Sequence, residues 1–355
     1  MINFGIIGVG WRTEFYLRIA KACPDRFTVS GIVGRTPAKA EAISRRFNVP
    51  LYGSVEELVR AGGPDFVVTS VSWDANPGIL KLLASLGMPA LSETPPATSV
   101  EEMVELCSSV REGAKIQVAE QYFLQPHHSA RLAFARSGKI GRVTQAQISV
   151  AHGYHGISLI RRFLGIGFEN AKIDAMAFKS PIVKGHGRAG APAQEEIVES
   201  EQIIAHLDFG DRLGVFDFTD KQYFAAIRDS RVLIRGERGE IINDSAVYLK
   251  AFLTPIRVAF IRHTAGEHEN LEGHYLKGIQ AGEEWVYRNP VAPGALFDDE
   301  IAVADCLLKM AEYAAGGAPF YPLAEACQDR YLDIALHEAL RDKSPVVTTT
   351  QPWAE

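Results

Sequence analysis

The sequence predicts a two-domain protein: a dinucleotide-binding α/β domain over residues 1–121 and an α+β domain over residues 122–355. We expect the second domain to be built on a large open sheet that is mostly antiparallel or mixed. Three observations support this. Short apolar runs alternate with helical patterns in the first 120 residues, and a Gly-x-Gly turn follows the first of these runs. After residue 125, strand patterns follow one another largely without helices between them.

Composition limits the class of protein. The chain has 355 residues, 47% of them hydrophobic, which is enough for two cores. Its net charge of −6 comes from interspersed acidic and basic residues, so neither a nucleic-acid nor a membrane partner is expected. The four cysteines have no metal-ligand spacing, and no metal site is predicted. The sequence has no run of about 20 apolar residues, and its first apolar segment starts at Ile2 without a signal-peptide pattern. We therefore expect a cytoplasmic protein.

The first domain reads as a series of βαβ units. Segments with helical periodicity separate the apolar runs, so a parallel sheet covered on both faces is expected. Two helices have capping-box patterns, Ser54 with Glu57 and Ser99 with Glu102. The predicted strands are residues 2–8, 27–33, 50–53, 65–71, 89–93 and 114–119.

The second domain has a different pattern. Many of its segments alternate apolar with polar residues, which is typical of strands with one solvated face. The segments RVLIRG and GEIIND, joined around Glu237 and Arg238, predict a hairpin. A glycine-rich stretch over residues 184–196 predicts a loop, and two long helices are expected at about 298–315 and 321–341. We expect the last helix to pack back on the first domain.

The turn after the first strand has the dinucleotide-binding pattern. Gly8 permits a tight turn, and Gly10 lets a pyrophosphate approach the backbone at the start of a helix. Thr13 replaces the third glycine of the pattern, which predicts a slightly wider turn. Trp11 and Arg12 complete this candidate cofactor-binding segment.

The end of the second strand indicates which dinucleotide is bound. An acidic residue that would hold the ribose hydroxyls of NAD is absent, and Arg35 and Thr36 follow Gly34 instead. A 2′-phosphate would be compatible with this pair, so we expect NADP rather than NAD, with NAD left open because Arg35 could also stack on adenine. Ser70 and Val71, at the end of the strand 65–71, are further candidate cofactor-binding residues.

The whole chain resembles the glucose–fructose oxidoreductase and inositol dehydrogenase (Gfo/Idh/MocA) family. The resemblance rests on the order and spacing of several motifs across about 340 residues. It implies a Rossmann domain, a substrate domain with a large open sheet, and NAD(P)-dependent oxidation or reduction of sugars, polyols and related compounds. It also implies a homodimer or homotetramer formed through that sheet. The motifs are GIIGVG, DFVVTSV, LSETP, SGKIGRV, GYHGISLIRRFLG and VLIRGERGEI.

One family motif is altered after the fifth strand. In the family this strand ends in Glu-Lys-Pro, where the glutamate lies near the cofactor and the lysine transfers a proton. Glu93 and Pro95 match, but Thr94 stands at the lysine position. A threonine hydroxyl forms hydrogen bonds but is not a base at neutral pH. Glu93 and Thr94 are therefore assigned to the cofactor cleft, and the base must be sought elsewhere.

The second family motif, Asp-x-Gly-x-His-x-x-Asp, is altered as well. Gly153 and His155 match it, whereas Ala151 and Ser158 replace both aspartates. His155 is the remaining group suited to acid/base chemistry near pH 7. The alternative is that His155 is a structural histidine bonded at the domain junction.

Other candidate groups surround His155. Tyr122 follows the sixth strand and Tyr154 precedes His155, so both join His155 as predicted catalytic residues, with Tyr122 alternatively a packing residue. His152 is also within plausible reach, and Glu120 is the nearest alternative carboxylate. His127 and His128 are expected to be exposed.

Three functions are consistent with this sequence. The first is an NAD(P)-dependent oxidoreductase that moves a hydride between nicotinamide and a small hydroxylated or keto compound. The second is an NAD-dependent glycosidase or lyase that oxidises a sugar transiently and eliminates its aglycone, because some glycosidases of this fold also lack the lysine. The third is a catalytically inactive, dinucleotide-binding regulatory protein.

Overall fold

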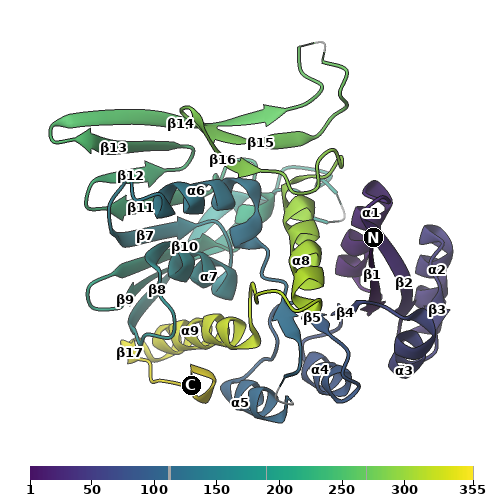
Figure 1. Cartoon of the computed structure of the whole chain (residues 1–355). Helices are drawn as coiled ribbons and strands as arrows, with labels where there is room; N and C mark the ends of the chain where they lie inside the picture. The colour runs from purple at the N-terminus through teal and green to yellow at the C-terminus, as the bar shows by residue number, and fades with distance from the viewer. Residues whose placement is uncertain (111–112, 189, 269, 355) are drawn as a thin grey trace.

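The computed structural model describes residues 1–110, 113–188, 190–268 and 270–354. Two β-sheets with their helices lie side by side, and helix α8 (Asp298–Ala314) runs between them (Figure 1). The predicted fold class is confirmed: a parallel Rossmann sheet is followed by a larger, mixed sheet.

The first sheet has six parallel strands in the order β3-β2-β1-β4-β5-β6. Its central strands are apolar and buried, as at Phe4, Ile6 and Phe66, because helices cover both faces. The strand order reverses between β1 and β4, which is the edge where open α/β sheets bind ligands. The elements are β1 (Ile2–Ile7), α1 (Trp11–Ala22), β2 (Phe27–Val33), α2 (Pro37–Phe47), β3 (Leu51–Tyr52), α3 (Val55–Glu57), β4 (Phe66–Thr69), α4 (Asn76–Ser85), β5 (Ala90–Ser92), α5 (Val100–Ser109) and β6 (Ile116–Val118).

Two helices begin at the predicted serine caps. Ser99 accepts a hydrogen bond from the Glu102 N–H at 3.2 Å, and the Glu102 carboxylate accepts one from the Ser99 N–H at 3.4 Å, which completes a capping box. Ser54 accepts from the Glu57 N–H at 3.1 Å, but the Glu57 carboxylate binds the N–H of Gly53 instead. The helix starts are thus set by local sequence.

The second sheet has eleven strands in the order β16-β15-β14-β13-β12-β11-β7-β10-β9-β8-β17. Among the described strands, β7 and β10 form a parallel pair and the other neighbours are antiparallel. The hairpin of β11 and β12 is the one that the sequence predicts. The strands are β7 (Val143–Ser149), β8 (Lys172–Val183), β9 (Ile197–Asp208), β10 (Leu213–Thr219), β11 (Arg231–Gly236), β12 (Gly239–Ile242), β13 (Ser245–Ala251), β14 (Thr254–Thr264), β15 (Leu276–Ala281), β16 (Glu284–Arg288) and β17 (Val346–Val347).

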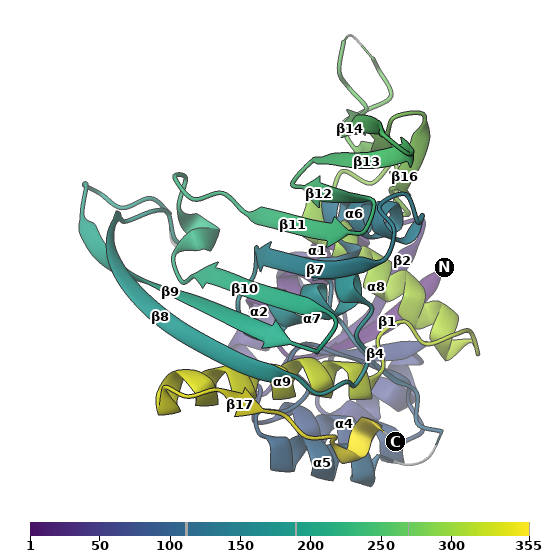
Figure 2. The same ribbon diagram turned by 90° about the vertical axis from the view of Figure 1, so that its left-hand side faces the viewer.

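Helices cover one face of this curved sheet (Figure 2). They are α6 (Pro126–Arg136), α7 (Gly153–Leu164) and α9 (Leu323–Asp342), and their apolar residues join the core. The opposite face has exposed apolar side chains, including Met176 and Phe178 on β8, which are 58% and 57% exposed. The large sheet therefore has one packed face and one open face.

A buried arginine joins α7 to α9. The Arg161 guanidinium lies 2.6 Å from the Asp329 carboxylate and 2.9 Å from that of Glu325, and it also donates to the Gly167 carbonyl. Burial alone would lower the pKa of Arg161, but the surrounding acidic groups more than offset it and raise that pKa. This network fixes α7 relative to α9.

The segment before α9 is bound in turn to the first sheet. The Gln117 side chain on β6 accepts hydrogen bonds from the N–H groups of Phe320 and Tyr321 at 2.9 and 2.8 Å. Helix α5 also contacts α9, where the Sγ atoms of the free cysteines Cys107 and Cys327 are 3.8 Å apart. The first sheet, α9 and α7 therefore form one packed unit.

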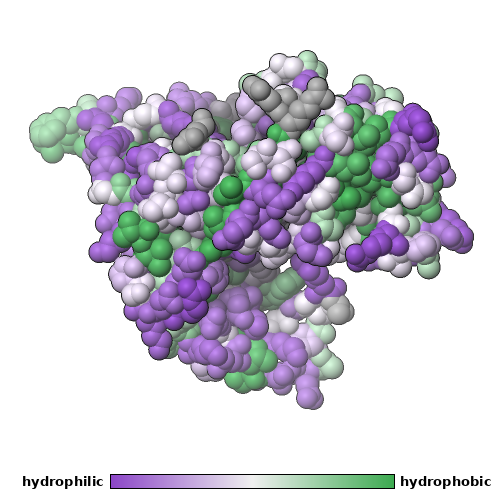
Figure 3. Space-filling model, turned by 90° about the horizontal axis from the view of Figure 1, so that it is seen from below, coloured by the Kyte–Doolittle hydropathy of each residue, from purple (hydrophilic) through white to green (hydrophobic). Residues whose placement is uncertain are grey.

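The surface seen from below is mostly hydrophilic, and hydrophobic residues gather in separate patches (Figure 3). None of the helices in the described part of the chain combines the length and apolar composition that a bilayer crossing requires.

Candidate functional site

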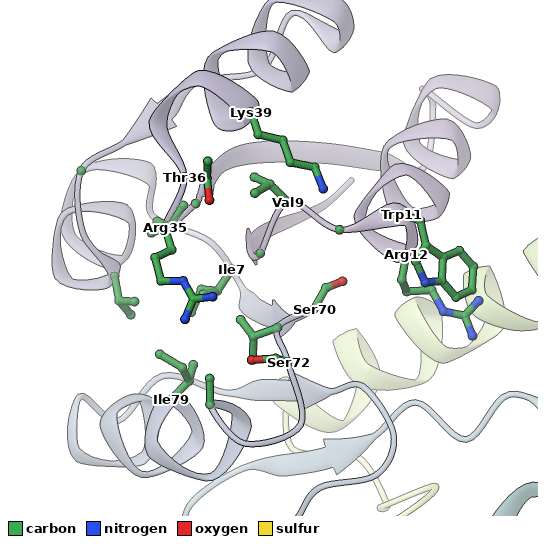
Figure 4. Close-up of a pocket in the computed structure, with 18 residues that line it drawn as sticks. Ile7, Val9, Trp11, Arg12, Arg35, Thr36, Lys39, Ser70, Ser72 and Ile79 are labelled. Atoms are coloured by element: carbon green, nitrogen blue, oxygen red, sulfur yellow. The ribbon is translucent and has the colours of Figure 1, made fainter. Parts of the chain in front are cut away.

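A cavity of about 530 Å³ lies at the carboxyl ends of β1 and β4 (Figure 4). The predicted residues Gly8, Gly10, Arg35 and Thr36 line it. Its lining is Ile7, Gly8, Val9, Gly10, Trp11, Arg12, Val33, Gly34, Arg35, Thr36, Lys39, Gly53, Val55, Ser70, Val71, Ser72, Ala75 and Ile79.

The glycine turn fits a dinucleotide pyrophosphate. Gly8 has a φ of +121°, and a Cβ atom there would lie 1.9 Å from the carbonyl oxygen of Ser70. A Cβ at Gly10 would have no atom within 4 Å, so the space above this residue is open. Gly10 is the N-cap of the 12-residue helix α1 and supplies no side-chain cap, which leaves the first N–H groups of α1 available to an anion.

The other end of the cavity is cationic. Arg35 and Lys39 both extend into it, from the turn before α2 and from the first turn of α2 (Figure 4). None of its lining residues is acidic. The sequence reasoning missed Lys39, although its place two residues into a helix that begins at Pro37 was a usable signal.

The remaining predicted cofactor residues divide into those that line the cavity and those that do not, which are Thr13, Glu93 and Thr94. Trp11, Arg12, Ser70 and Val71 line the cavity. Thr13 is fully buried behind it, with its Oγ1 3.2 Å from the Ser70 hydroxyl, and so it packs α1 against β4.

Glu93 is bound to the helix that follows the glycine turn. The Tyr16 hydroxyl donates a hydrogen bond to the Glu93 carboxylate, and the Arg12 Nε lies 3.4 Å from it. Arg12 also pairs with Asp299 of α8 at 3.1 Å. Burial alone would lower the pKa of Arg12, but Glu93 and Asp299 outweigh it and raise that pKa. Glu93 therefore connects β5 to the start of α1.

Thr94 reaches the second domain. Burial raises the pKa of Tyr154 and the adjacent Thr94 hydroxyl partly offsets this, so the phenol remains protonated at neutral pH.

His155 and Glu120 form a buried pair across the domain junction. The Nδ1 atom of His155, on α7, lies 2.6 Å from a carboxylate oxygen of Glu120, which follows β6. The two residues are only 5% and 1% exposed. The second Glu120 oxygen accepts a hydrogen bond from the Tyr122 N–H at 3.2 Å. Among the described residues, no hydrogen bond engages Nε2 of His155, which leaves it available to a ligand.

Aromatic rings surround this imidazole. The ring centroids of Tyr154 and Tyr122 lie 4.4 and 4.5 Å from that of His155, and the His152 ring lies 5.1 Å away. The structure thus brings the three predicted catalytic residues together. It adds Tyr223, which the sequence reasoning missed and whose hydroxyl lies 3.0 Å from that of Tyr122.

A second carboxylate lies close to this cluster. Asp333 of α9 is buried, and one of its oxygens would lie 2.7 Å from a Cβ placed on Gly153 at the start of α7. The family motif has aspartates at the positions of Ala151 and Ser158, so here a carboxylate reaches the same helix end from another element. No pattern near Asp333 indicates this placement.

The expectation that His128 is exposed was wrong. Its side chain is buried and its Nδ1 lies 3.3 Å from Arg131, one turn later on α6. Burial and the Arg131 charge lower the pKa of His128 and keep it neutral.

Comparison with known proteins gives a family match for the first domain. Residues 2–121 match the Gfo/Idh/MocA model, described as an oxidoreductase family with an NAD-binding Rossmann fold. The first domain of the chain thus matches this oxidoreductase family, and the second domain lies outside the match. A curated relative in Bacillus subtilis (strain 168), named as an oxidoreductase, YteT, is 22% identical over 170 residues. This match spans 44% of the chain and 40% of the length of that relative.

Solved structures share the fold over nearly the whole chain. A levoglucosan dehydrogenase in complex with NADH and levoglucosan has a TM-score of 0.69 and 16% identity, with 98% of this chain and 99% of that chain covered. A myo-inositol dehydrogenase from Corynebacterium glutamicum has a TM-score of 0.67 and 15% identity, covering 98% and 99%. A biliverdin reductase from Synechocystis, in complex with biliverdin and NADP+, has a TM-score of 0.60 and 14% identity, covering 96% and 99%.

The two glycines of the turn give a paired prediction. Gly10→Ala should change the free energy of unfolding by less than about 0.5 kcal/mol and weaken NAD(P) binding at least about tenfold, because its methyl group enters the open space of the cavity. Gly8→Ala should lower the free energy of unfolding by about 2 kcal/mol or more, because its Cβ would overlap the Ser70 carbonyl. Urea unfolding and calorimetric titration with NAD+ and with NADP+ measure both effects. Equal loss of stability in the two variants would contradict the assignment of Gly10 to the pyrophosphate.

Proposed function

We propose that this protein transfers a hydride between the nicotinamide of NADP(H) and a carbon atom of a small hydroxylated or carbonyl compound of the sugar or polyol type. The observation that carries the proposal is the buried Glu120–His155 pair, whose imidazole packs against the rings of Tyr122 and Tyr154. A bound nicotinamide supplies or accepts the hydride. The protein must supply binding, orientation and a proton acceptor.

His155 is the proposed proton acceptor. The hydrogen bond between Nδ1 and Glu120 fixes the orientation of the ring and leaves Nε2 to take a proton from a substrate hydroxyl, or to return it in the reverse reaction. The Glu120 carboxylate stabilises the imidazolium that forms. Thr94 is not suited to this step, because its hydroxyl holds its proton too tightly.

The substrate class is supported by the relatives and by the rings of the cluster. Two of the structural relatives are named as dehydrogenases of levoglucosan and myo-inositol, which are polyhydroxylated rings. Tyr122 is partly exposed and His152 is exposed beside His155, and the apolar face of such a ring would pack against these two side chains.

The proposed preference for NADP rests on charge. A 2′-phosphate carries about two negative charges near neutral pH, and Arg35 and Lys39 both reach into the adenosine end of a cavity whose lining lacks carboxylates. NAD has no such group for these cations to bind.

Activity assays on a defined panel test the function. The chain is incubated with myo-inositol, levoglucosan and L-sorbose, with both dinucleotides in both redox states, and absorbance of the reduced nicotinamide is followed. Net hydride transfer to or from one of these compounds supports the proposal. Cleavage of an aryl glycoside without net production of reduced cofactor would favour the glycosidase alternative. Dinucleotide binding without turnover of the three panel compounds or of the aryl glycoside would favour a regulatory protein.

The acid/base pair gives a kinetic prediction. His155→Gln should lower kcat about 100-fold or more, and Glu120→Gln should lower it about tenfold or more, because a neutral amide cannot stabilise the imidazolium as a carboxylate does. Dinucleotide affinity should stay within about twofold of wild type, because neither residue lines the cofactor cavity. Steady-state kinetics and titration with NADP+ measure the two effects. A His155→Gln variant with wild-type kcat would remove His155 from the mechanism.

The cationic end of the cavity gives a specificity prediction. Lys39→Ala and Arg35→Ala should each weaken NADP binding about tenfold or more, because each removes a charge-assisted hydrogen bond to the 2′-phosphate. NAD binding should change by less than about twofold. Calorimetric titration with both dinucleotides measures the difference, and Lys21→Ala at the exposed end of α1 is the matched control. Equal losses for NADP and NAD would contradict a 2′-phosphate site.

The open face of the large sheet supports a proposed homodimer or homotetramer. The register places Met176 opposite Ile204, so the exposed apolar side chains of β8, Met176 and Phe178, are joined by one apolar neighbour on β9. A double substitution, Met176→Glu with Phe178→Glu, should convert the oligomer to monomers without unfolding them. Light scattering measures the mass, and Leu86→Glu at the end of α4 is the control. A monomeric wild-type chain would contradict this proposal.

A further inference from the structure

Two thiols face each other where the two domains pack together. Cys107 lies near the end of α5 in the first domain, and Cys327 lies near the start of α9 in the second, 220 residues later. The two helices lie side by side (Figure 2). Their Sγ atoms are 3.8 Å apart, and both cysteines are free. A disulfide bond brings two sulfur atoms to about 2.05 Å, so a small movement of these side chains would close the gap.

The packing around the two thiols holds them close together. Leu106 and Trp353 are buried in the same apolar cluster as Cys327, and Cys107 packs against that cluster. The indole N–H of Trp353 donates a hydrogen bond to the side chain of Gln328, the neighbour of Cys327, at 3.1 Å. Close-packed side chains leave little room for either thiol to turn away. The short distance between the sulfur atoms is therefore a property of the folded junction.

The two thiols differ in their access to small molecules. Cys327 is fully buried, whereas Cys107 is partly exposed. Cys107 also lines a cavity of about 500 Å³ between α5, β6 and the segment before α9, and Cys327 is not part of that lining. A cavity of this volume admits a small molecule. A reagent that enters it meets Cys107 first.

The contact between the two sulfur atoms also favours ionisation of Cys107. A hydrogen bond from the Cys327 thiol lowers the pKa of Cys107, and the same contact together with burial raises the pKa of Cys327. The thiolate is the form of cysteine that attacks a disulfide. Access and ionisation therefore select the same sulfur atom, that of Cys107.

We propose that Cys107 and Cys327 are a redox-active pair, which a low-molecular-weight disulfide such as oxidised glutathione converts to an intramolecular disulfide between the two domains. This pair is independent of the proposed function, because it involves neither the cofactor cavity nor the acid/base pair. The new bond would join α5 to α9, the helix that holds α7 through Arg161 and Asp329. Oxidation would thus fasten the domain junction covalently.

The exchange balances over two steps. Cys107 gives its proton to solvent, its thiolate attacks one sulfur of oxidised glutathione, and the S–S bond of that molecule breaks to release one glutathione thiolate. Cys327 then loses its proton and attacks the Cys107 sulfur of the mixed disulfide, which releases the second glutathione thiolate. Each departing thiolate takes up one proton. The protein loses two electrons and two protons, and the reagent gains them as two molecules of reduced glutathione.

Redox titration of the full folded chain tests the pair. The protein is equilibrated in mixtures of reduced and oxidised glutathione, quenched with acid, unfolded and blocked with N-ethylmaleimide, and its peptides are identified by mass spectrometry. A Cys107–Cys327 disulfide should form with a single midpoint and disappear with dithiothreitol. Cys23 and Cys306 are internal controls that should stay reduced, because both are buried and neither contacts another thiol among the described residues. Absence of the Cys107–Cys327 disulfide in the most oxidising mixture would overturn the proposal.

Single variants separate the roles of the two thiols. In Cys327→Ala, oxidised glutathione should leave a mixed disulfide on Cys107, because the resolving thiol is missing. In Cys107→Ala, Cys327 should stay unmodified over the same time, because it is buried and does not line the cavity. Cys23→Ala should form the intramolecular disulfide as the wild type does. Glutathione on Cys327 but not on Cys107 would contradict the assigned order of attack.

Thermal unfolding tests whether the bond fits the folded junction. The oxidised protein should unfold about 3–6 °C above the reduced protein, because the cross-link restricts the unfolded chain over a long loop. Cys107→Ala, treated with the same mixtures, should show no shift. Scanning calorimetry measures the midpoints. An unchanged or lower midpoint in the oxidised wild type would contradict a disulfide that the native structure accommodates.

Discussion

The geometry of the candidate site depends on the buried ion pair between Arg161 and Asp329. This pair holds α7 against α9, and the segment before α9 is bound to β6 through Gln117. Because β6 leads to Glu120 and α7 begins just before His155, the two halves of the acid/base pair are aligned by the same set of contacts. A buried charge that lost its partner would cost several kcal/mol, roughly 3–5 kcal/mol in comparable cases, so the arrangement tolerates little adjustment. The domain junction is therefore a rigid part of the site.

The backbone and the side chains of the cavity bind different parts of the dinucleotide. The pyrophosphate end is a backbone structure, in which Gly8 allows β1 to approach β4 and Gly10 leaves space in front of α1. The adenosine end depends on the charges of Arg35 and Lys39. At the end of β5, Glu93 is neutralised by Arg12 and bound by Tyr16, so its charge is already paired in the protein. Each part of the cleft thus uses a different physical interaction.

The altered family motifs and the structure are consistent with each other. Replacement of the lysine by Thr94 removes an ammonium group from the end of β5, and both motif aspartates are missing from α7 and the residues before it. The structure has carboxylates near the same helix from two other elements, Glu120 after β6 and Asp333 on α9. Ionisable groups are thus retained at the junction, although they come from different parts of the chain. Because Glu120 and Asp333 lie outside the two motifs, the motif positions alone do not reveal these carboxylates.

The sequence by itself determined those features that depend on neighbours along the chain. The six parallel strands, the cap at Ser99, the hairpin of β11 and β12 and the glycine turn all follow from periodicity, capping or turn chemistry within a few residues.

Only the tertiary structure decided which distant groups meet. Glu120 and His155 are 35 residues apart, and Tyr122 and Tyr223 are 101 apart. The buried His128 was missed for the same reason, since the face that a helix turns inward depends on what packs against it. Local rules act over one or two helical turns, whereas a site at a domain junction is assembled by long-range packing.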